Sequence, residues 1–216
     1  AAYLPHIRKV LPQGPVFIAG WSFGGLLAFE AAYRLQQAGI DVRGVSLLDA
    51  VAIPDSVRAI LRKDEAEYLA DMFSELGILD ADQLRVMTPE QRIDYLLAQG
   101  KSSDLLPQNA DRSVIRRLLA VFQNNALAAI HYVPPKLDDV DVLLVRPTTA
   151  SRAAPGIDGD PYSGWQKFVG GTICLQWVPG THGSMMMAPD IVGVANCIRQ
   201  QIGCRGLFSP SENLTG

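Results

Sequence analysis

The pentapeptide Gly-Trp-Ser-Phe-Gly at residues 20–24 constrains the fold more than any other feature of the chain. It follows the apolar run 16–19, which is typical of a short, fully buried strand, and precedes residues 26–37, whose apolar side chains recur at helical spacing. A serine at such a junction occupies a tight, strained turn, and the glycines two positions away leave room for the strand and helix to pack closely. This pattern predicts that the Ser22 hydroxyl stands clear of the sheet, as a nucleophile must.

The elements around this turn predict an open α/β sheet. A second strand is expected at 45–48, and Gly39 lies where a left-handed helix C-cap belongs. Strand, helix and strand in succession form a right-handed crossover with parallel strands. Further strands are expected at 140–146 and 172–178, with a closing helix at about 189–201. We therefore predict a mostly parallel sheet with flanking helices.

A helical insertion interrupts this pattern, because no strand-like run occurs between about residues 54 and 130. Within it, Thr88 is expected to cap a helix that has Pro89 at its first position and Gln91 completing a capping box. Residues 111–130 predict a long helix with one apolar side. The predicted organisation is an α/β core at 1–53 and 131–208, a helical insertion at 54–130 and a polar tail at 209–216.

Composition excludes several classes of function. The 216 residues include 19 Lys and Arg against 22 Asp and Glu, so the net charge of −3 leaves no basic surface for nucleic acid. No apolar run of about 18 residues is present to span a membrane. The three cysteines are unpatterned and no secretory leader is visible, which favours a reducing, cytoplasmic location. The three widely spaced histidines form no metal-ligand motif, so we expect no metal.

A serine nucleophile needs a base, and only three histidines are available. His6 lies in an expected solvent-facing helix, and His131 ends the long helix of the insertion. His182 follows a predicted strand in a loop flanked by glycines, which is where the base of an α/β-hydrolase falls. The sequence favours His182 as the base.

The acid that orients this base has two possible positions. Asp49 ends the strand after the nucleophile helix, so its carboxylate is expected at the same sheet edge as Ser22. Asp158 and Asp160 follow the later strand, where most α/β-hydrolases carry their acid, but they need a long loop that folds back. Geometry favours Asp49, with Asp158 and Asp160 as the alternatives.

Three more residues are candidates around Ser22. The N–H of Phe23 opens the helix and is expected to donate to a developing oxyanion, which the helix dipole also favours. Trp21 is expected either to line a substrate pocket or to pack beneath the turn. Met185, beside Met186 and Met187, could form a deformable apolar wall for substrate or pack in the core.

Several segments together resemble a known family. Residues 20–39 (GWSFGGLLAFEAAYRLQQAG), 45–50 (VSLLDA) and 178–186 (VPGTHGSMM), with the helical insertion and the final helix, resemble the thioesterase domains that end nonribosomal peptide synthetases. Trp21 and the Gly24-Gly25 pair look more like the peptide-synthetase branch than the polyketide branch. The resemblance implies an α/β-hydrolase fold, Asp49 as the acid, His182 as the base and residues 54–130 as a lid.

The resemblance also implies a reaction. A peptidyl or acyl chain on the phosphopantetheine of an upstream peptidyl carrier domain would move to Ser22 and leave by hydrolysis or macrocyclisation, as a lactone or lactam and possibly after oligomerisation. The domain itself is expected to bind no cofactor. The early strands and the second oxyanion-hole amide are expected before Ala1, since only 15 residues precede Val16.

Three other functions remain open from the sequence. A separate editing thioesterase that clears misprimed carriers uses the same chemistry, and so does a polyketide-type thioesterase. A noncatalytic interaction module with a hydrolase fold would not need Ser22, Asp49 and His182 together.

Overall fold

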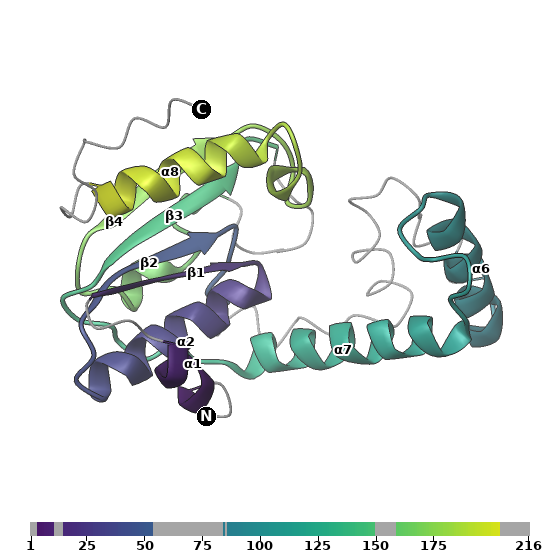
Figure 1. Cartoon of the computed structure of the whole chain (residues 1–216), viewed down its shortest axis with the longest axis horizontal. Helices are drawn as coiled ribbons and strands as arrows, with labels where there is room; N and C mark the ends of the chain where they lie inside the picture. The colour runs from purple at the N-terminus through teal and green to yellow at the C-terminus, as the bar shows by residue number, and fades with distance from the viewer. Residues whose placement is uncertain (1–3, 11–14, 54–83, 85, 150–158, 204–216) are drawn as a thin grey trace. The chain divides into compact units, whose positions relative to one another are not determined.

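The computed structural model describes residues 4–10, 15–53, 84, 86–149 and 159–203 of the chain, which divides into two compact units (Figure 1). Unit 1 comprises Ala1–Pro54 and Val133–Gly216, and unit 2 comprises Asp55–Tyr132. The predicted polar tail at 209–216 lies outside the described residues, as does Asp158.

Unit 1 is built on a four-stranded sheet in the order β1-β2-β3-β4, and every neighbouring pair is parallel. The strands are β1 (Val16–Trp21), β2 (Val42–Leu48), β3 (Asp141–Pro147) and β4 (Ile173–Val178). Helix α1 (Leu4–Val10) precedes β1, and helix α2 (Phe23–Gln37) connects β1 to β2. Gly39 after α2 has a φ of 76°, which confirms the expected left-handed position. The predicted α/β sheet with parallel strands is therefore confirmed.

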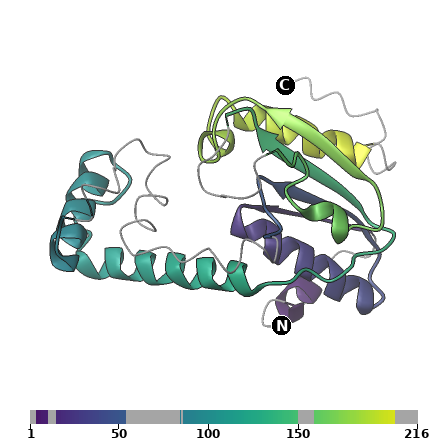
Figure 2. The same ribbon diagram turned by 180° about the vertical axis from the view of Figure 1, so that it is seen from behind.

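Helices cover both faces of this sheet. Gly25 of α2 lies against Leu47, whereas the Ser46 hydroxyl donates a hydrogen bond of 2.6 Å to Gln201 of α8 (Ile191–Gly203). Successive strand residues point to opposite faces, so α2 and α8 lie on opposite sides of β2 (Figures 1 and 2). Apart from Arg43, every residue of β2 is buried, as expected for a strand covered on both faces.

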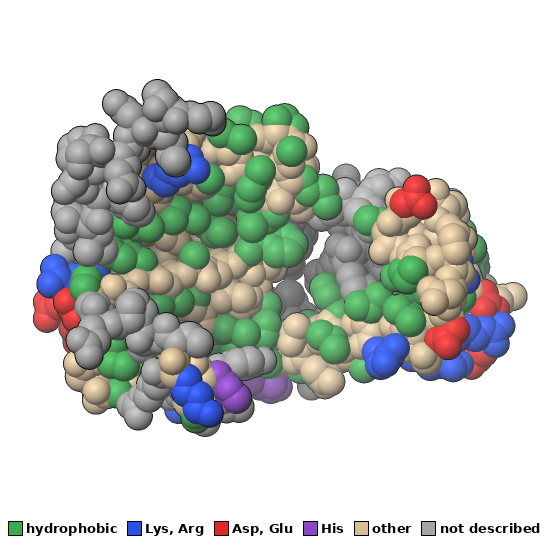
Figure 3. Space-filling view, in the orientation of Figure 1, with side chains coloured by type: hydrophobic (Ala, Val, Ile, Leu, Met, Phe, Trp, Pro, Cys, Tyr) green, Lys and Arg blue, Asp and Glu red, His purple; other side chains and the backbone are tan. Residues whose placement is uncertain are grey.

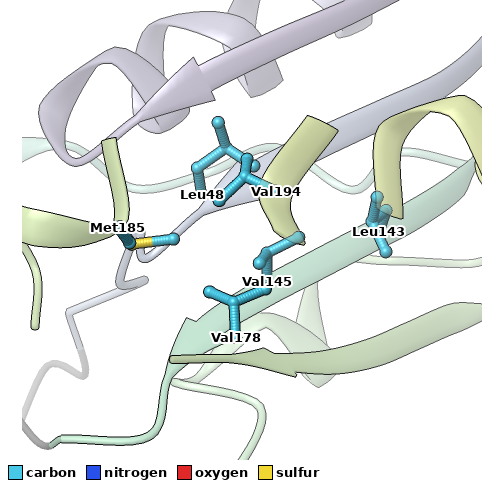
Figure 4. Packing of buried hydrophobic residues seen from close by; sticks show 6 residues of the cluster. All are labelled: Leu48, Leu143, Val145, Val178, Met185 and Val194. Atoms are coloured by element: carbon cyan, nitrogen blue, oxygen red, sulfur yellow. The ribbon is translucent and has the colours of Figure 1, made fainter. Parts of the chain in front are cut away.

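A hydrophobic cluster fastens the chain after β4 to the sheet (Figure 4). Met185, in the short helix η2 (Ser184–Met186), has no exposed surface. It packs in a cluster with Leu48, Leu143, Val145, Val178 and Val194. Truncating a buried side chain of this size to alanine costs about 2–5 kcal/mol. This cluster therefore anchors the segment that leads from β4 to α8.

Strand β1 differs from the prediction of a fully buried strand. Only Val16 is buried among its six residues, and Trp21 is 39% exposed. In the described part of the chain β1 pairs with β2 on one side and forms an edge of the sheet. The burial expected from the apolar run was wrong because it assumed sheet neighbours on both sides.

Unit 2 contains α6 (Pro89–Ser102) and α7 (Arg112–His131). The Thr88 side chain accepts from the Gln91 N–H and the Gln91 side chain accepts from the Thr88 N–H, which confirms the predicted capping box. Unit 2 has its own hydrophobic cluster, which contains Leu84, Ile93, Leu96, Ile115 and Leu119. Charged side chains gather around the junction of α6 and α7 (Figure 3), where Arg112 donates two hydrogen bonds of 2.6 Å to Asp94. No helix among the described residues is long and apolar enough to cross a membrane.

Candidate active site

Ser22 lies at the turn between β1 and α2 in a strained backbone conformation. Its φ of 55° and ψ of −126° are rarely adopted by a residue with a side chain. The Ser22 N–H donates to the Leu48 carbonyl at 2.9 Å, so the sheet continues one residue past the end of β1. A Cβ on Gly20 would overlap the carbonyl oxygen of Gly24, so the close strand–helix approach requires glycine. The turn has the form that the pentapeptide predicts.

Asp49 emerges from the neighbouring strand at the same sheet edge. Leu48 pairs with Trp21 on one side and with Val145 on the other, and the Asp49 N–H donates to the Val145 carbonyl at 2.8 Å. Asp49 also has a positive φ, of 45°. Because parallel strands end together, Ser22 and Asp49 follow paired residues, as the sequence predicted.

His182 joins Asp49 through its ring. The imidazole Nδ1 lies 2.7 Å from the Asp49 Oδ2, although the two residues are 133 positions apart. An ionised carboxylate can only accept, so Nδ1 is the donor in such a pair, and a neutral ring then presents Nε2 as an acceptor. The Asp49 residue is 9% exposed, so little water competes for this hydrogen bond. The arrangement is that of a base held by an acid.

The alternative residues occupy other environments. The Asp160 carboxylate accepts from the N–H groups of Tyr162 at 2.9 Å and Gly164 at 2.7 Å, so it stabilises a local turn. His6, on α1, and His131, at the end of α7, are both exposed. Of these candidates in the described part of the chain, Asp49 and His182 are the carboxylate and the imidazole that the structure joins by a hydrogen bond.

Arg146 is a charged residue of this site that the sequence analysis missed. At the end of β3, its Nε lies 3.8 Å from the Asp49 Oδ1, and its Nη1 donates to the Asp160 carbonyl at 3.1 Å. The guanidinium also lies over the Trp177 ring, 5.5 Å from its centre. Arg146 thus places a positive charge beside the carboxylate. A basic residue at the end of a buried apolar strand was the signal that could have revealed it.

A buried tryptophan supports the loop that follows Asp49. Trp165, in the short helix η1 (Trp165–Lys167), donates from its indole nitrogen to the Ala50 carbonyl at 2.9 Å. Its ring packs against Phe29 of α2, with centroids 4.7 Å apart. The Ser163 carbonyl accepts from the Ala52 N–H at 2.9 Å. These contacts fix the backbone from which Asp49 projects.

The three remaining candidates lie in different surroundings. Phe23 is the first residue of α2, so the helix itself offers no partner for its N–H. Trp21 stacks on His182, with ring centroids 4.9 Å apart. Met185 is fully buried in the core, whereas Met187 is 57% exposed. Core packing thus describes the position of Met185. No group of three or more His, Cys, Asp or Glu suited to a metal occurs among the described residues.

Family membership follows from comparison with known sequences. The model of the family described as Thioesterase domain matches residues 1–201. The chain belongs to the thioesterase domain family. Its fold is the α/β fold of solved thioesterases, and membership of the family makes it a thioesterase.

Relatives of the thioesterase are multidomain synthases. It is 26% identical over 209 residues to chondramide synthase cmdD of Chondromyces crocatus, covering 91% of this chain and 5% of that protein. It is 27% identical to the nonribosomal peptide synthetase btyA of Aspergillus terreus, covering 95% of this chain and 23% of that protein. The chain thus spans less than a quarter of the length of these two relatives.

Solved structures show the same fold. The thioesterase superimposes on AB3403, a four-domain nonribosomal peptide synthetase, with a TM-score of 0.78 and 32% identity, covering 92% of this chain and 15% of that one. The NocB thioesterase domain in covalent complex with a fluorophosphonate nocardicin G analogue gives a TM-score of 0.63 at 22% identity, covering 94% and 72% of the two chains. The second match supports the fold alone.

Proposed function

We propose that this thioesterase ends a nonribosomal peptide synthetase and releases its product. In this proposal a peptidyl or acyl chain arrives as a thioester on the phosphopantetheine of an upstream carrier domain and is transferred to Ser22. Release then follows by water or by a nucleophile of the chain itself. The similarity to synthetases such as btyA and AB3403 supports this setting.

One observation carries the chemical part of the proposal. The strained Ser22 turn and the hydrogen-bonded Asp49–His182 pair emerge at the same edge of the parallel sheet. A serine hydroxyl is a weak nucleophile at neutral pH and needs a base, and the base needs a fixed tautomer. Asp49 supplies that tautomer by accepting from Nδ1.

The first half-reaction forms the acyl-enzyme. The Ser22 oxygen attacks the thioester carbonyl while its proton moves to the His182 Nε2. The oxyanion that develops lies at the N-terminus of α2, where the Phe23 N–H can donate to it. The carbon–sulfur bond then breaks, and the departing thiol takes the proton from His182.

The second half-reaction releases the chain. Water, or an amine or hydroxyl of the acyl chain, attacks the ester carbonyl and gives its proton to His182. The Ser22–acyl bond breaks, and Ser22 recovers its proton from His182. Water yields a free acid, and an internal nucleophile yields a lactam or lactone. Exclusion of water favours ring formation.

Unit 2 would serve as the lid in this scheme. It forms a compact unit with its own hydrophobic cluster, which supports a distinct role for the predicted insertion at 54–130. A lid that covers the acyl chain would limit the access of water to the ester.

The test is a covalent adduct on Ser22. The intact protein is incubated with a fluorophosphonate or with a phosphopantetheine-linked acyl thioester, and the modified peptide is located by mass spectrometry. We expect modification of Ser22 in the natural protein and none in the His182→Ala or Ser22→Ala variants. Folded natural protein that remains unmodified under both conditions would refute the acyl-enzyme mechanism.

The natural product distinguishes the two modes of release. A ring has the mass of the free acid less one water molecule.

A second experiment distinguishes a terminal thioesterase from an editing thioesterase, since a terminal domain accepts the complete chain of its own synthetase. An editing thioesterase instead removes stalled acyl groups from carriers, and a preference for such groups over the complete chain would overturn the terminal role.

A further inference from the structure

Trp21 makes two separate contacts with His182, from a strand that is remote in sequence. Its ring stacks on the imidazole with centroids 4.9 Å apart and planes inclined by 27°. Its indole nitrogen donates a hydrogen bond of 3.0 Å to the backbone carbonyl of the same histidine. One side chain therefore contacts both the ring and the backbone of the base.

The two partners differ in how firmly the fold holds them. Trp21 is the last residue of β1 and pairs with Leu48 at the end of β2. His182 lies in the loop between β4 and η2. A residue on a strand places its side chain more precisely than one on a loop. Trp21 therefore restrains the position of the His182 loop relative to the sheet.

Two further hydrogen bonds of this loop involve residues other than His182. The Thr181 N–H donates to the Ser184 hydroxyl at 2.9 Å, and that hydroxyl donates to Asp190 at 2.8 Å. The imidazole itself contacts Asp49 at Nδ1 and Trp21 on its face. An edge contact and a face contact restrict different rotations of the ring, so the two together direct Nε2.

We propose that Trp21 is a positioning residue that holds His182 in the orientation needed to take the Ser22 proton. This inference rests on the proposed function, in which His182 is the base. Trp21 directly precedes Ser22, so one strand end carries both the nucleophile and the support of its base. With 39% of its surface exposed, Trp21 could instead contact an acyl chain, and the experiment must separate these two roles.

The experiment measures the rate of Ser22 phosphonylation by a small fluorophosphonate in the intact protein. In this step the Ser22 oxygen bonds to phosphorus, fluoride leaves, and His182 accepts the Ser22 proton and passes it to solvent. The probe lacks a long acyl chain, so its rate reports on the base and not on an acyl pocket. Acetyl and decanoyl thioesters of N-acetylcysteamine are then compared for kcat and KM.

Three variants are compared with the natural protein. Trp21→Leu removes the ring stacking and the indole donor, whereas Trp21→Phe keeps a stacking ring and loses only the donor. Leu27→Ala is the control, since Leu27 is a 44% exposed apolar side chain on α2. Thermal unfolding verifies that each variant is folded.

We expect Trp21→Leu to slow phosphonylation about 10-fold or more, because a small misplacement of a catalytic group is costly. In Trp21→Phe the phosphonylation rate should fall only about threefold, since aromatic stacking is retained. Both should lower kcat by similar factors for the two thioesters and leave KM little changed. The downfield Nδ1 proton signal of His182 should broaden in Trp21→Leu. Leu27→Ala should behave as the natural protein.

Other results lead to different conclusions. Phosphonylation at the natural rate in both Trp21 variants, with His182→Ala inactive, would overturn the inference and leave the proposed function in place. An effect confined to the KM of the decanoyl thioester would assign Trp21 to the acyl pocket and also overturn it. Natural protein that is not phosphonylated at Ser22 would overturn the proposed function itself.

Discussion

Replacement of Asp49 by asparagine tests the assignment of the acid. The substitution keeps the shape of the side chain and removes its charge. Asn can present its amide NH₂ to the imidazole Nδ1, which then becomes the acceptor and leaves the proton on Nε2. In that tautomer Nε2 cannot accept the Ser22 proton. Asp49→Asn should therefore leave a folded protein whose base holds its proton in the wrong place.

The structure allows an estimate of the effect. The hydrogen bond at stake is 2.7 Å long and joins His182 to a carboxylate that is 9% exposed. A charge-assisted bond of this kind contributes about 1.5–3 kcal/mol. Since 1.36 kcal/mol is tenfold in rate, loss of the bond alone slows acylation about 10- to 150-fold. Because the unfavourable tautomer also leaves Nε2 unable to accept the Ser22 proton, the expected fall in the acylation rate rises toward about 10⁴-fold.

The assay is single-turnover acylation of Ser22 by an acyl thioester, followed by mass spectrometry. Asp160→Asn is the matched control, because the Asp160 carboxylate accepts from the N–H groups of Tyr162 and Gly164 in a local turn. We expect that control to retain acylation within a few-fold and to lose some thermal stability. Retention of acylation in Asp49→Asn, with loss in Asp160→Asn, would refute the assignment of the acid.

Three further predictions concern local features. Gly20→Ala should destabilise the fold by about 1–3 kcal/mol, because the added Cβ overlaps the Gly24 carbonyl oxygen. Gly24→Ala is the control, since its Cβ meets no atom within 4 Å. Equal unfolding midpoints for the two variants would contradict this prediction. Thr88→Ala removes the cap of α6 and should cost about 1 kcal/mol, measured by denaturant unfolding; an unchanged midpoint would argue against the cap. Burial, and to a lesser extent Cys174, raises the pKa of the Cys197 thiol, so iodoacetamide should modify the exposed Cys174 first at neutral pH; peptide mass spectrometry showing the reverse order would contradict this.

Features that depend on residues close together in the sequence were predicted correctly. The capping box of Thr88 and Gln91 and the left-handed Gly39 were among these, and the backbone of Ser22 has the expected strain. Each depends on backbone geometry or on hydrogen bonds between residues a few positions apart, so the local residue types suffice. The burial of β1 was predicted incorrectly because it depends on the strands that pair with it.

Some residues of the candidate site could likewise be predicted from the sequence, and others required the tertiary structure. Asp49 could be favoured from the sequence because parallel strands joined by a crossover end at one edge of the sheet. Arg146 was missed because its approach to Asp49 depends on β3, which lies about a hundred residues away along the chain and pairs with β2. The core position of Met185 likewise depends on contacts with β3 and α8.

The sequence by itself determined that a serine stands on a strained turn between a strand and a helix, because Gly20 allows the close approach of the strand to the helix that such a turn requires. It also limited the base to three histidines. Only the tertiary structure decided which carboxylate and which indole hold His182, since Asp49 and Trp21 are 133 and 161 positions from it. Contacts at such separations arise from strand pairing and packing, which no local pattern of residues specifies.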